Sequence, residues 1–464
     1  MKNEFGYIDE KTFKECDTEK QMFSTISIDD EGIEFKTNGI NKMSVFDSDK
    51  MPKAIYAVNS RLEAITALRL RPESCNFTAI SSSVIKSDMY FIKQGTLTEG
   101  EKIKHFTTET KIKEIYYYSD SLSKIFLNNS FVSSCKLKNN TLKSVKIYGK
   151  KCNAEKLGDY ILLDGNKVEV LLKCDFKYNH QYSGCERVEI KDNSYLKLRF
   201  KKGIVFSEAY KFILLLDSVV YLMTFMKRRH KNIIIKDFKK DSYLCIDKRK
   251  DSEERKVEWR NFLICERKDA KKEFVNLFKN MYSLNEDAKN AMFPFLEFDS
   301  KQTSLEIKFL EYYKALEYIE YKENLKKGKG KNPTFLVQVL KNNHDLKQRF
   351  FGNQAEKDIE EEIRSLRNFY SHTGYYLKEL PIPTNKPKRI KVIDTKWLYD
   401  VLEYLKVQTY IEFYKICGIN ADWDKIINNL WFKNKRKTRW YNENPKRCNN
   451  WPSNRWRHGR PTRI

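Results

Sequence analysis

The sequence has few of the features that mark secreted, zinc-bound or membrane-spanning proteins. Its ten cysteines include no Cys-x-x-Cys pair, which argues against a zinc ribbon and, in a reducing compartment, against a disulfide framework. The first residues, MKNEFGYIDEKTFKE, are polar where a secretory signal needs an apolar core. The longest apolar stretch, at 212–226, contains Asp217 and falls short of the about twenty residues that span a membrane. We therefore expect a cytoplasmic protein with no membrane segment.

Two of these features leave alternatives open. The apolar stretch 212–226 is typical of a buried helix, but three basic residues, 227–229, follow it, so a helix lying on a membrane surface is the alternative. Cys174, His180 and Cys185 have the ligand types that bind zinc, although their spacing fits no common structural site. We expect core or loop residues there, and hence no metal and no cofactor.

Acidic residues are too few to balance the basic ones. The chain has 88 Lys and Arg against 63 Asp and Glu, a formal net charge of +25 at pH 7. Such an excess favours a polyanionic partner, because cations that contact phosphates release bound counterions. Nucleic acid is the obvious candidate. A Lys-rich composition that merely reflects a biased genome is the alternative.

The N-terminal half, residues 1–205, is predicted to be a β-rich domain. From about residue 30 it has short β-branched and aromatic runs broken by Gly, Asn, Asp and Ser. The clearest hairpin is DYILLDGNKVEVLL at 159–172, where Asp164 and Gly165 suit a tight turn. SYLKLRF at 194–200 alternates, so its apolar residues can face a core while Lys197 and Arg199 face water.

Residues 206–285 are predicted to connect this domain to a second one. The period changes to that of a helix near Ser207, and this helix is expected to pack against the sheet. Residues 240–270 are dense in charge, which is typical of a solvated connection or an exposed helix.

Residues 286–425 are predicted to form a helical bundle, which makes the fold class α+β. Helices are expected at 304–325, at TFLVQVLKNN after Pro333, at 354–372 and at 394–417, where Asp394 is the expected N-cap. In the third helix, an apolar stripe is expected at Ile359, Ile363, Leu366 and Phe369 or Tyr370. Helices of this number and spacing favour a bundle.

The C-terminal end of the third of these helices carries the chemical motif. RNFYSH, at 367–372, places a polar residue, Asn368, directly after an Arg and a His five positions after that Arg. The spacing alone is weak support, because a chain with this many Arg residues gives such a match by chance. Its place at the end of an amphipathic helix in an all-helical region is the stronger indication.

The helical order, the ALEYI segment at 315–319 and above all RSLRNFYSHTG resemble a C-terminal HEPN ribonuclease domain. Its pairing with a β-rich N-terminal half resembles the ApeA family of bacterial anti-phage proteins. The resemblance implies a β-rich sensor or regulatory domain on a HEPN bundle, and metal-independent cleavage of host RNA, with tRNA suspected, in abortive infection. It also implies a phage-derived trigger. The motif's Arg corresponds to Arg367, its polar residue to Asn368 and its His to His372. Where some HEPN toxins have a Tyr two positions after the His, this chain has Gly374.

The chemistry needs these residue types. A neutral imidazole at His372 can take the proton from a ribose 2′-hydroxyl, and the guanidinium of Arg367 can stabilise the charge that develops on the phosphate. The products would then be a 2′,3′-cyclic phosphate and a 5′-hydroxyl. Asn368 shares a helix face with His372 and is expected to orient the imidazole or contact the substrate, with Arg364 and Ser371 as weaker candidates.

Arg367 and His372 are about 140° apart around an ideal helix, and this separation favours a site that a second chain completes. The family solution is a homodimer or higher homo-oligomer formed through the HEPN domain, and two-fold pairing is common in any case. The alternatives are a surface helix end, where the helix dipole favours a His, and a non-catalytic nucleic-acid-binding or antitoxin-like module. No compact group of carboxylates supports a metal-dependent nuclease.

The tail, residues 426–464, differs from the rest of the chain. From Trp431 onward it has eleven Lys or Arg against Glu443 alone, interleaved with four Trp. Such a segment can bind phosphates and stack on bases, and a disordered tail or a frameshift remnant is the alternative. No catalytic residue is assigned to it.

Overall fold

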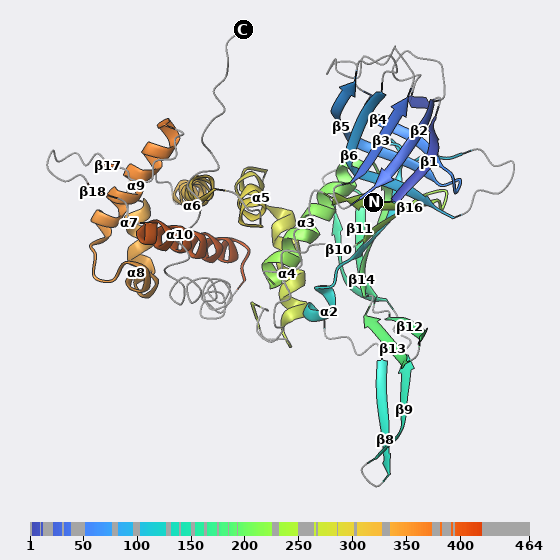
Figure 1. Cartoon of the computed structure of the whole chain (residues 1–464). Coiled ribbons are helices and arrows are strands. Elements are labelled where there is room, and N and C mark those ends of the chain that lie inside the picture. Colours follow the sequence, from blue (N-terminus) through green and yellow to red (C-terminus); the bar gives the residue numbers. More distant parts are fainter. Residues whose placement is uncertain are drawn as a thin grey trace. The chain divides into compact units, whose positions relative to one another are not determined.

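The structure is a computed structural model of the chain (Figure 1). Its contacts divide the chain into two compact units, Met1–Val257 with Glu266–Lys289, and Glu258–Cys265 with Asn290–Ile464. The first unit is built on β-sheet and the second on helices, so the predicted α+β class is confirmed. The residues that the structure describes are 2–9, 11–12, 22–29, 32–38, 52–76, 82–95, 103–126, 131–138, 141–149, 154–161, 165–173, 176–183, 185–192, 194–224, 232–248, 264–265, 268–284, 286–300, 304–326, 335–373, 381–382, 391–392 and 395–419.

The first unit is larger than the β-rich domain expected over 1–205. The expected connecting region, 206–285, contributes to it α3 (Phe206–Thr224), β15 (Asn232–Asp237), β16 (Ser242–Asp247) and α4 (Ala270–Ser283). In both strands, NIIIKD and SYLCID, every second residue is buried and the residues between are less buried. They are short and lie beside densely charged segments, so the overall charge of the region concealed their period of two.

Six antiparallel strands of the first unit close into a barrel (Figure 1). They follow the order β6-β3-β2-β1-β4-β5, and β5 pairs again with β6. The barrel encloses an apolar core that includes Ile26, Phe35, Ile55 and Ile65. Because the ring is closed, each of these strands has a hydrogen-bonded neighbour in the barrel on both sides. The strands are β1 (Lys2–Ile8), β2 (Met22–Ile28), β3 (Ile33–Asn38), β4 (Ala54–Asn59), β5 (Ala64–Asn76) and β6 (Ser82–Gln94).

Strand β6 belongs to the barrel and also to a second sheet. Its first half, to Ser87, pairs with β3, and its second half, from Met89, pairs with β16, while β5 pairs along both halves. Gly32, just before β3, lies where the two sheets separate. Its φ is +146°, and a Cβ at this position would overlap the carbonyl oxygen of Ser87. A glycine is therefore required at the branch.

The second sheet continues from β6 in the order β16-β15-β7-β14-β11-β10. The predicted hairpin at 159–172 is confirmed as β10 paired with β11, and Gly165 in its turn has a φ of +76°. The predicted alternation at 194–200 is also confirmed, since Leu196, Leu198 and Phe200 are buried. The new strands are β7 (Ile112–Tyr118), β10 (Glu155–Ile161), β11 (Lys167–Lys173) and β14 (Tyr195–Ile204).

Helix α3 covers one face of this sheet, as predicted for the apolar stretch. The Tyr117 hydroxyl donates a 2.9 Å hydrogen bond to the buried Asp217 carboxylate, which is the charge that interrupts the stretch. The rings of Phe200 and Phe212 also meet between sheet and helix. Helix α4 packs on α3 and β10, and the short α2 (Leu122–Ile125) contacts both helices. This hydrogen bond offsets part of the cost of burying the carboxylate in an apolar layer.

Two further hairpins form separate two-stranded sheets, β8 (Phe131–Lys138) with β9 (Thr141–Gly149) and β12 (Phe176–Ser183) with β13 (Cys185–Asp192). Of the weighed zinc ligands, Cys174 and the side chains of His180 and Cys185 lie outside the described residues. Among the side chains that are described, no three His, Cys, Asp or Glu are grouped to hold a metal ion.

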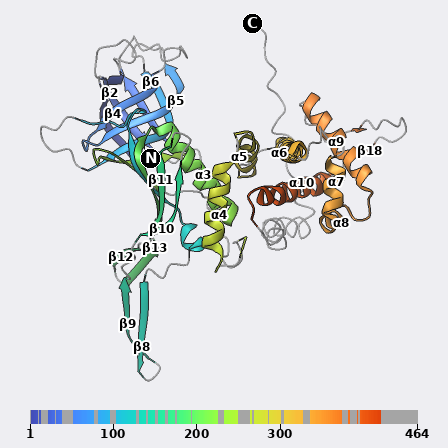
Figure 2. The same cartoon turned by 180° about the vertical axis from the view of Figure 1, so that it is seen from behind.

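The second unit contains the helices predicted for the C-terminal half. Helices at 304–325, 354–372 and 394–417 are confirmed as α6, α9 and α10, and TFLVQVLKNN as α7. Helix α10 lies between α6 and α8 and contacts both (Figures 1 and 2). Pro333 and Asp394 lie outside the described residues. The elements are α5 (Glu286–Ser300), α6 (Leu305–Lys326), α7 (Phe335–Asn342), α8 (His344–Phe351), α9 (Glu356–Thr373) and α10 (Thr395–Ile416), with the short strands β17 (Pro381–Ile382) and β18 (Lys391–Val392).

The helices differ in length and in apolar character. Within the described part of the chain, none is both long and apolar enough to cross a membrane.

We predict that Gly32→Ala lowers the free energy of unfolding by about 3 kcal/mol, because backbone strain costs about 1–3 kcal/mol and the new Cβ must also displace the Ser87 carbonyl. Gly95→Ala is the matched control, since Gly95 also has a positive φ, +105°, but has open space at its Cβ position. That variant should lose only about 1 kcal/mol. Urea unfolding of both variants measures the difference, and equal losses would contradict the required close approach.

Candidate active site

Helix α9 carries the Arg and His of the motif. The predicted apolar stripe is confirmed, because Ile359, Ile363 and Leu366 are fully buried and Tyr370 is nearly so. The side chain of Phe369 lies outside the described residues. The acidic residues Glu356 and Asp358 in the first turn complement the positive end of the helix dipole. The stripe fixes how the helix is rotated and leaves Arg367 at the margin of the buried face.

Helix α6 packs against α9 and is held in place from its other side. The buried carboxylate of Asp299, on α5, accepts hydrogen bonds from Tyr312 of α6 at 2.8 Å and from Tyr410 of α10 at 2.6 Å. It also pairs with Lys406 of α10 at 2.6 Å. This Asp299 cluster, made of Asp299, Tyr312, Lys406 and Tyr410, joins three helices. Since Tyr312 is turned toward Asp299, its neighbour Tyr313 is turned toward α7 and α9, where it meets the Phe335 ring.

Charge within the cluster is balanced. Burial by itself lowers the pKa of Lys406, but the carboxylates of Asp299 and Glu403 outweigh this effect and raise it above the ordinary value. Lys406 therefore stays protonated at neutral pH. A buried ion pair of this kind costs desolvation, and the two tyrosine hydroxyls help to offset that cost by satisfying the carboxylate oxygens.

Arg367 contacts one residue of its own helix and two of α6. Its Nη1 donates a 3.0 Å hydrogen bond to Oδ1 of Asn368, and its Nη2 lies 3.9 Å from Oε2 of Glu317. The guanidinium carbon lies 5.8 Å from the centre of the Tyr313 ring. The Arg367 side chain nevertheless remains 39% exposed. These contacts hold the guanidinium at the surface, where a phosphate can reach it.

Arg364, the weaker sequence candidate, has a different partner. Its Nη1 lies 3.5 Å from Oε1 of Glu360, one turn earlier on α9. Burial raises the pKa of Glu360, although the Arg364 charge opposes the shift. Arg364 and Arg367 therefore belong to separate ion pairs on neighbouring turns of the helix.

The ring of Tyr313 lies beside Arg367. Burial, together with the nearby Glu317 carboxylate, raises the pKa of Tyr313 to about 12. The phenol is therefore neutral at physiological pH and can donate a hydrogen bond but cannot serve as a base. Burial is also the main cause that raises the pKa of Tyr370, on α9, to about 12.

His372 and Ser371 lie in the last turn of α9, and their side chains are outside the described residues. The helical backbone continues through both positions to Thr373. Arg367 and His372 are therefore separated by about 7.5 Å along the axis and about 140° around it. The expected contact between Asn368 and the imidazole falls on the same undescribed side chains, and the contact that is described for Asn368 is with Arg367.

Two residues of the site, Tyr313 and Glu317, were not singled out from the sequence. Glu317 belongs to the ALEYI segment, which was noted only for its resemblance to a family. Its role depends on the packing of α6 against α9, which brings together positions fifty residues apart in the chain. The sequence does show that Glu317 lies beside the apolar stripe of α6. Periodicity alone, however, predicts that a carboxylate at such a position faces solvent.

We predict that Asp299→Asn lowers the free energy of unfolding by about 3–5 kcal/mol, because it leaves the buried Lys406 ammonium without its counter-charge. Asp358→Asn, at an exposed position in α9, should cost less than about 1 kcal/mol. Adding Lys406→Met to Asp299→Asn should recover part of the loss. Urea unfolding followed by circular dichroism measures all three, and an Asp299 variant as mild as the Asp358 control would contradict the role of the cluster.

Comparison with known proteins adds no further identification of this site. No protein-family model matches the chain, and neither a curated protein nor a solved structure matches it.

Proposed function

We propose that the protein is a metal-independent endoribonuclease of the HEPN type, with Arg367 and His372 as its catalytic residues. The observation that carries the proposal is the position of Arg367, whose guanidinium is held by Glu317 and Asn368 but remains partly exposed, on the same helix as His372. Cleavage of an RNA phosphodiester requires a fixed, permanently charged donor and a residue that can accept a proton, and α9 carries one residue of each kind.

The reaction begins at the ribose 2′-hydroxyl. His372 takes its proton, and the 2′ oxygen forms a bond to the adjacent phosphorus. The bond from phosphorus to the 5′ oxygen of the next nucleotide then breaks. The departing oxygen must gain a proton, which water or a second, protonated imidazole can supply. No oxidant or further reactant is needed. The RNA is left with a 2′,3′-cyclic phosphate on one side of the cut and a 5′-hydroxyl on the other.

Arg367 supports the same reaction at the phosphate. Negative charge grows on the non-bridging oxygens as the 2′ oxygen attacks, and a guanidinium can donate two parallel hydrogen bonds to them. Glu317 is a positioning residue in this scheme, because it holds the guanidinium without touching the reacting atoms. Fixing the donor in advance avoids the cost of ordering it during the reaction.

A dimer is part of the proposal. The angle of about 140° between Arg367 and His372 places them on different sides of one helix, so two copies of α9 are needed to surround a single phosphate. A two-fold axis between two HEPN units would then form two equivalent sites.

The biological setting is proposed from the resemblance to the ApeA family. The chain would cleave host RNA, with tRNA as the suspected substrate, during abortive infection in the cytoplasm. The β-rich first unit would sense a phage-derived trigger or restrain the nuclease. The net charge of +25 is compatible with an RNA substrate.

A non-catalytic nucleic-acid-binding or antitoxin-like protein is the second candidate. The observation that favours it is the pairing of Arg367 with Glu317, since a carboxylate partly neutralises the guanidinium that would otherwise stabilise a transition state. Binding without cleavage would still use the same basic surface.

We predict that His372→Ala lowers the rate of RNA cleavage in EDTA by about 10²–10⁴, through loss of the general base. Arg367→Lys should lower it by about 10²–10³, because an ammonium cannot donate in parallel pairs. His344→Ala, at an exposed position in α8, is the control and should leave the rate unchanged. Cleavage of labelled total tRNA measures the rates. Full activity of the His372 variant would reject this residue as the base.

We also predict that mixing inactive Arg367→Ala and His372→Ala chains restores activity. If each site takes its Arg from one copy and its His from the other, random pairing regenerates about one quarter of the wild-type sites. The mixture is unfolded and refolded together before the assay, and each variant treated alone is the control. Inactivity of the refolded mixture, with dimers demonstrated by light scattering, would mean that each site lies within one chain.

A further inference from the structure

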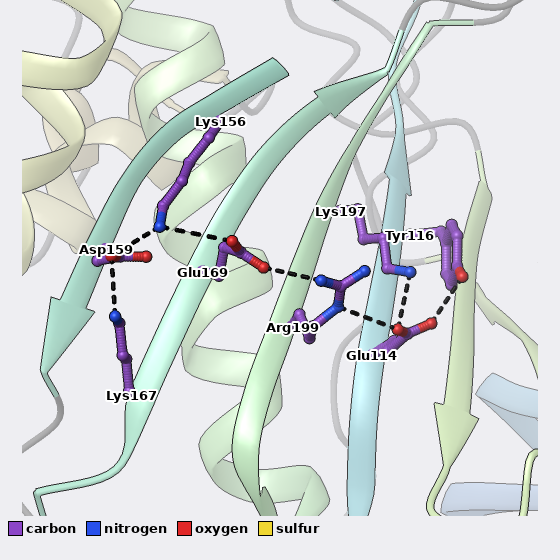
Figure 3. Close-up of polar contacts among 8 residues, drawn as sticks. All are labelled: Glu114, Tyr116, Lys156, Asp159, Lys167, Glu169, Lys197 and Arg199. Atoms are coloured by element: carbon purple, nitrogen blue, oxygen red, sulfur yellow. Dashed lines mark hydrogen bonds and ion pairs between the residues drawn. The ribbon is translucent and has the colours of Figure 1, made fainter. Parts of the chain in front are cut away.

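The second sheet of the first unit has one face under α3 and an opposite face that carries a row of charged side chains among some apolar ones, such as Leu171 and Ile234 (Figure 3). Along β14, the buried Leu196 and Leu198 alternate with Lys197 and Arg199, and the register of β10, β11 and β7 brings further polar residues into line with these two. Residues directly opposite each other in paired strands point to the same face. We call this surface the polar face.

Charged side chains connect four strands across the polar face (Figure 3). Glu169 of β11 lies 2.9 Å from Arg199 of β14, and Arg199 lies 3.4 Å from Glu114 of β7. Lys197 of β14 pairs with Glu114 at 2.7 Å. At the β10 edge, Lys156 and Lys167 pair with Asp159 at 2.8 and 3.0 Å. This network holds its side chains in an ordered row rather than leaving each to move in solvent.

The polar face nevertheless carries surplus positive charge. Its described residues include seven cations and three carboxylates, a net charge of +4. Among the described side chains, Lys173, Lys201 and Lys236 have no carboxylate within ion-pair distance. The cations are Lys156, Lys167, Lys173, Lys197, Arg199 and Lys236, together with Lys201, which is assigned to this face by the two-residue period of β14, and the carboxylates are Glu114, Asp159 and Glu169.

Tyrosine rings lie among these cations. Tyr116 has Lys197 and Lys236 at 5.0 and 4.9 Å from its ring centre, and its hydroxyl donates to Glu114. The ring of Tyr195 lies 5.5 Å from that of Tyr116 and 5.0 Å from that of Tyr118. Tyr116 and Tyr118 are half-buried and Tyr195 is buried. Aromatic rings beside ordered cations can stack on bases while the cations contact phosphates.

Exposure varies over the polar face. Lys156 and Lys167 at the β10 edge are about half exposed, at 49% and 51%, and Arg199 of β14 is 47% exposed, whereas Lys197 of β14, beside Tyr116, is only 16% exposed. Farther on, Ile246 of β16 and Ile92 of β6 pack against the barrel core. The tyrosines therefore lie between an exposed basic edge and the barrel, so that a strand entering at the edge meets cations before aromatic rings.

We propose that the polar face binds single-stranded nucleic acid, with the lysines of β10, β11 and β14 contacting phosphates and Tyr116 and Tyr118 stacking on unpaired bases. A duplex keeps its bases stacked on one another and offers no free base face to the tyrosines. A site made only for phosphates would gain nothing from the rings. This site is separate from α9, and it holds whether or not the second unit cleaves RNA.

The test measures binding of a fluorescent single-stranded oligonucleotide of mixed sequence to the full chain by anisotropy. The probe is made once as DNA and once as 2′-O-methyl RNA, so that binding of DNA and binding of RNA are measured separately. Neither probe has a free 2′-hydroxyl, so neither can be cut by the proposed ribonuclease reaction. Loss of binding therefore reports on the polar face, and loss of cleavage in the separate tRNA assay reports on α9.

Lys167→Gln with Lys201→Gln removes two exposed cations from the polar face, and Lys272→Gln with Lys279→Gln removes two exposed cations from α4 as the matched control. The first pair should weaken binding and reduce the slope of log K against log salt by about 1.4, at about 0.7 for each lost phosphate contact. The control pair should change neither quantity by a comparable amount.

Tyr118→Leu tests the stacking contribution and keeps an apolar side chain at the position. It should weaken binding of both probes about tenfold while leaving the salt slope unchanged, because stacking releases no counterions. Circular dichroism and urea unfolding establish that the variant is folded. The proposal is overturned if the folded Tyr118 variant binds normally, if the α4 pair loses as much affinity as the polar-face pair, or if the wild-type chain binds neither probe.

Discussion

The arrangement of the helical unit depends on one buried carboxylate. Asp299 accepts hydrogen bonds from Tyr312 and Tyr410 and pairs with Lys406, so α5, α6 and α10 share a single charged centre. A charge that is buried this deeply tolerates little displacement, because any shift leaves a polar group unsatisfied. The cluster therefore fixes the rotation of α6, and this rotation places Tyr313 and Glu317 against α9. The position of the Arg367 guanidinium therefore depends on a contact that another face of α6 makes.

The β-rich unit follows a different rule, the two-residue period of its strands. The side chains that meet α3 are apolar, and the alternate side chains of the same strands carry the charged network and the tyrosines of the polar face. Because β6 exchanges β3 for β16 along its length, the barrel and this sheet share one continuous backbone ladder. One periodic pattern thus supplies a core and a functional surface, and Gly32 permits the separation between them.

The periodicity of the sequence predicted the helices and strands better than it predicted the contacts between them. The helices α6, α9 and α10, the β10–β11 hairpin and the alternation in β14 followed from local patterns, since each buries one regular face. The strands β15 and β16 were assigned to a charged connection because their apolar runs are short. Barrel closure and the Glu317–Arg367 pair depend on residues far apart in the chain, which no local pattern encodes. The motif located Arg367, but its partners required the packing of two helices.

The central claim is that α9 carries a metal-independent ribonuclease centre, and the chemical identity of the cut ends tests it most directly. Wild-type protein is incubated with tRNA in EDTA, and the termini of the fragments are determined by enzymatic end-labelling before and after phosphatase treatment. The mechanism proposed for Arg367 and His372 requires a 2′,3′-cyclic phosphate and a 5′-hydroxyl at each cut. Fragments with a 3′-hydroxyl and a 5′-phosphate would contradict it, because such ends arise when water rather than the ribose 2′ oxygen attacks the phosphorus.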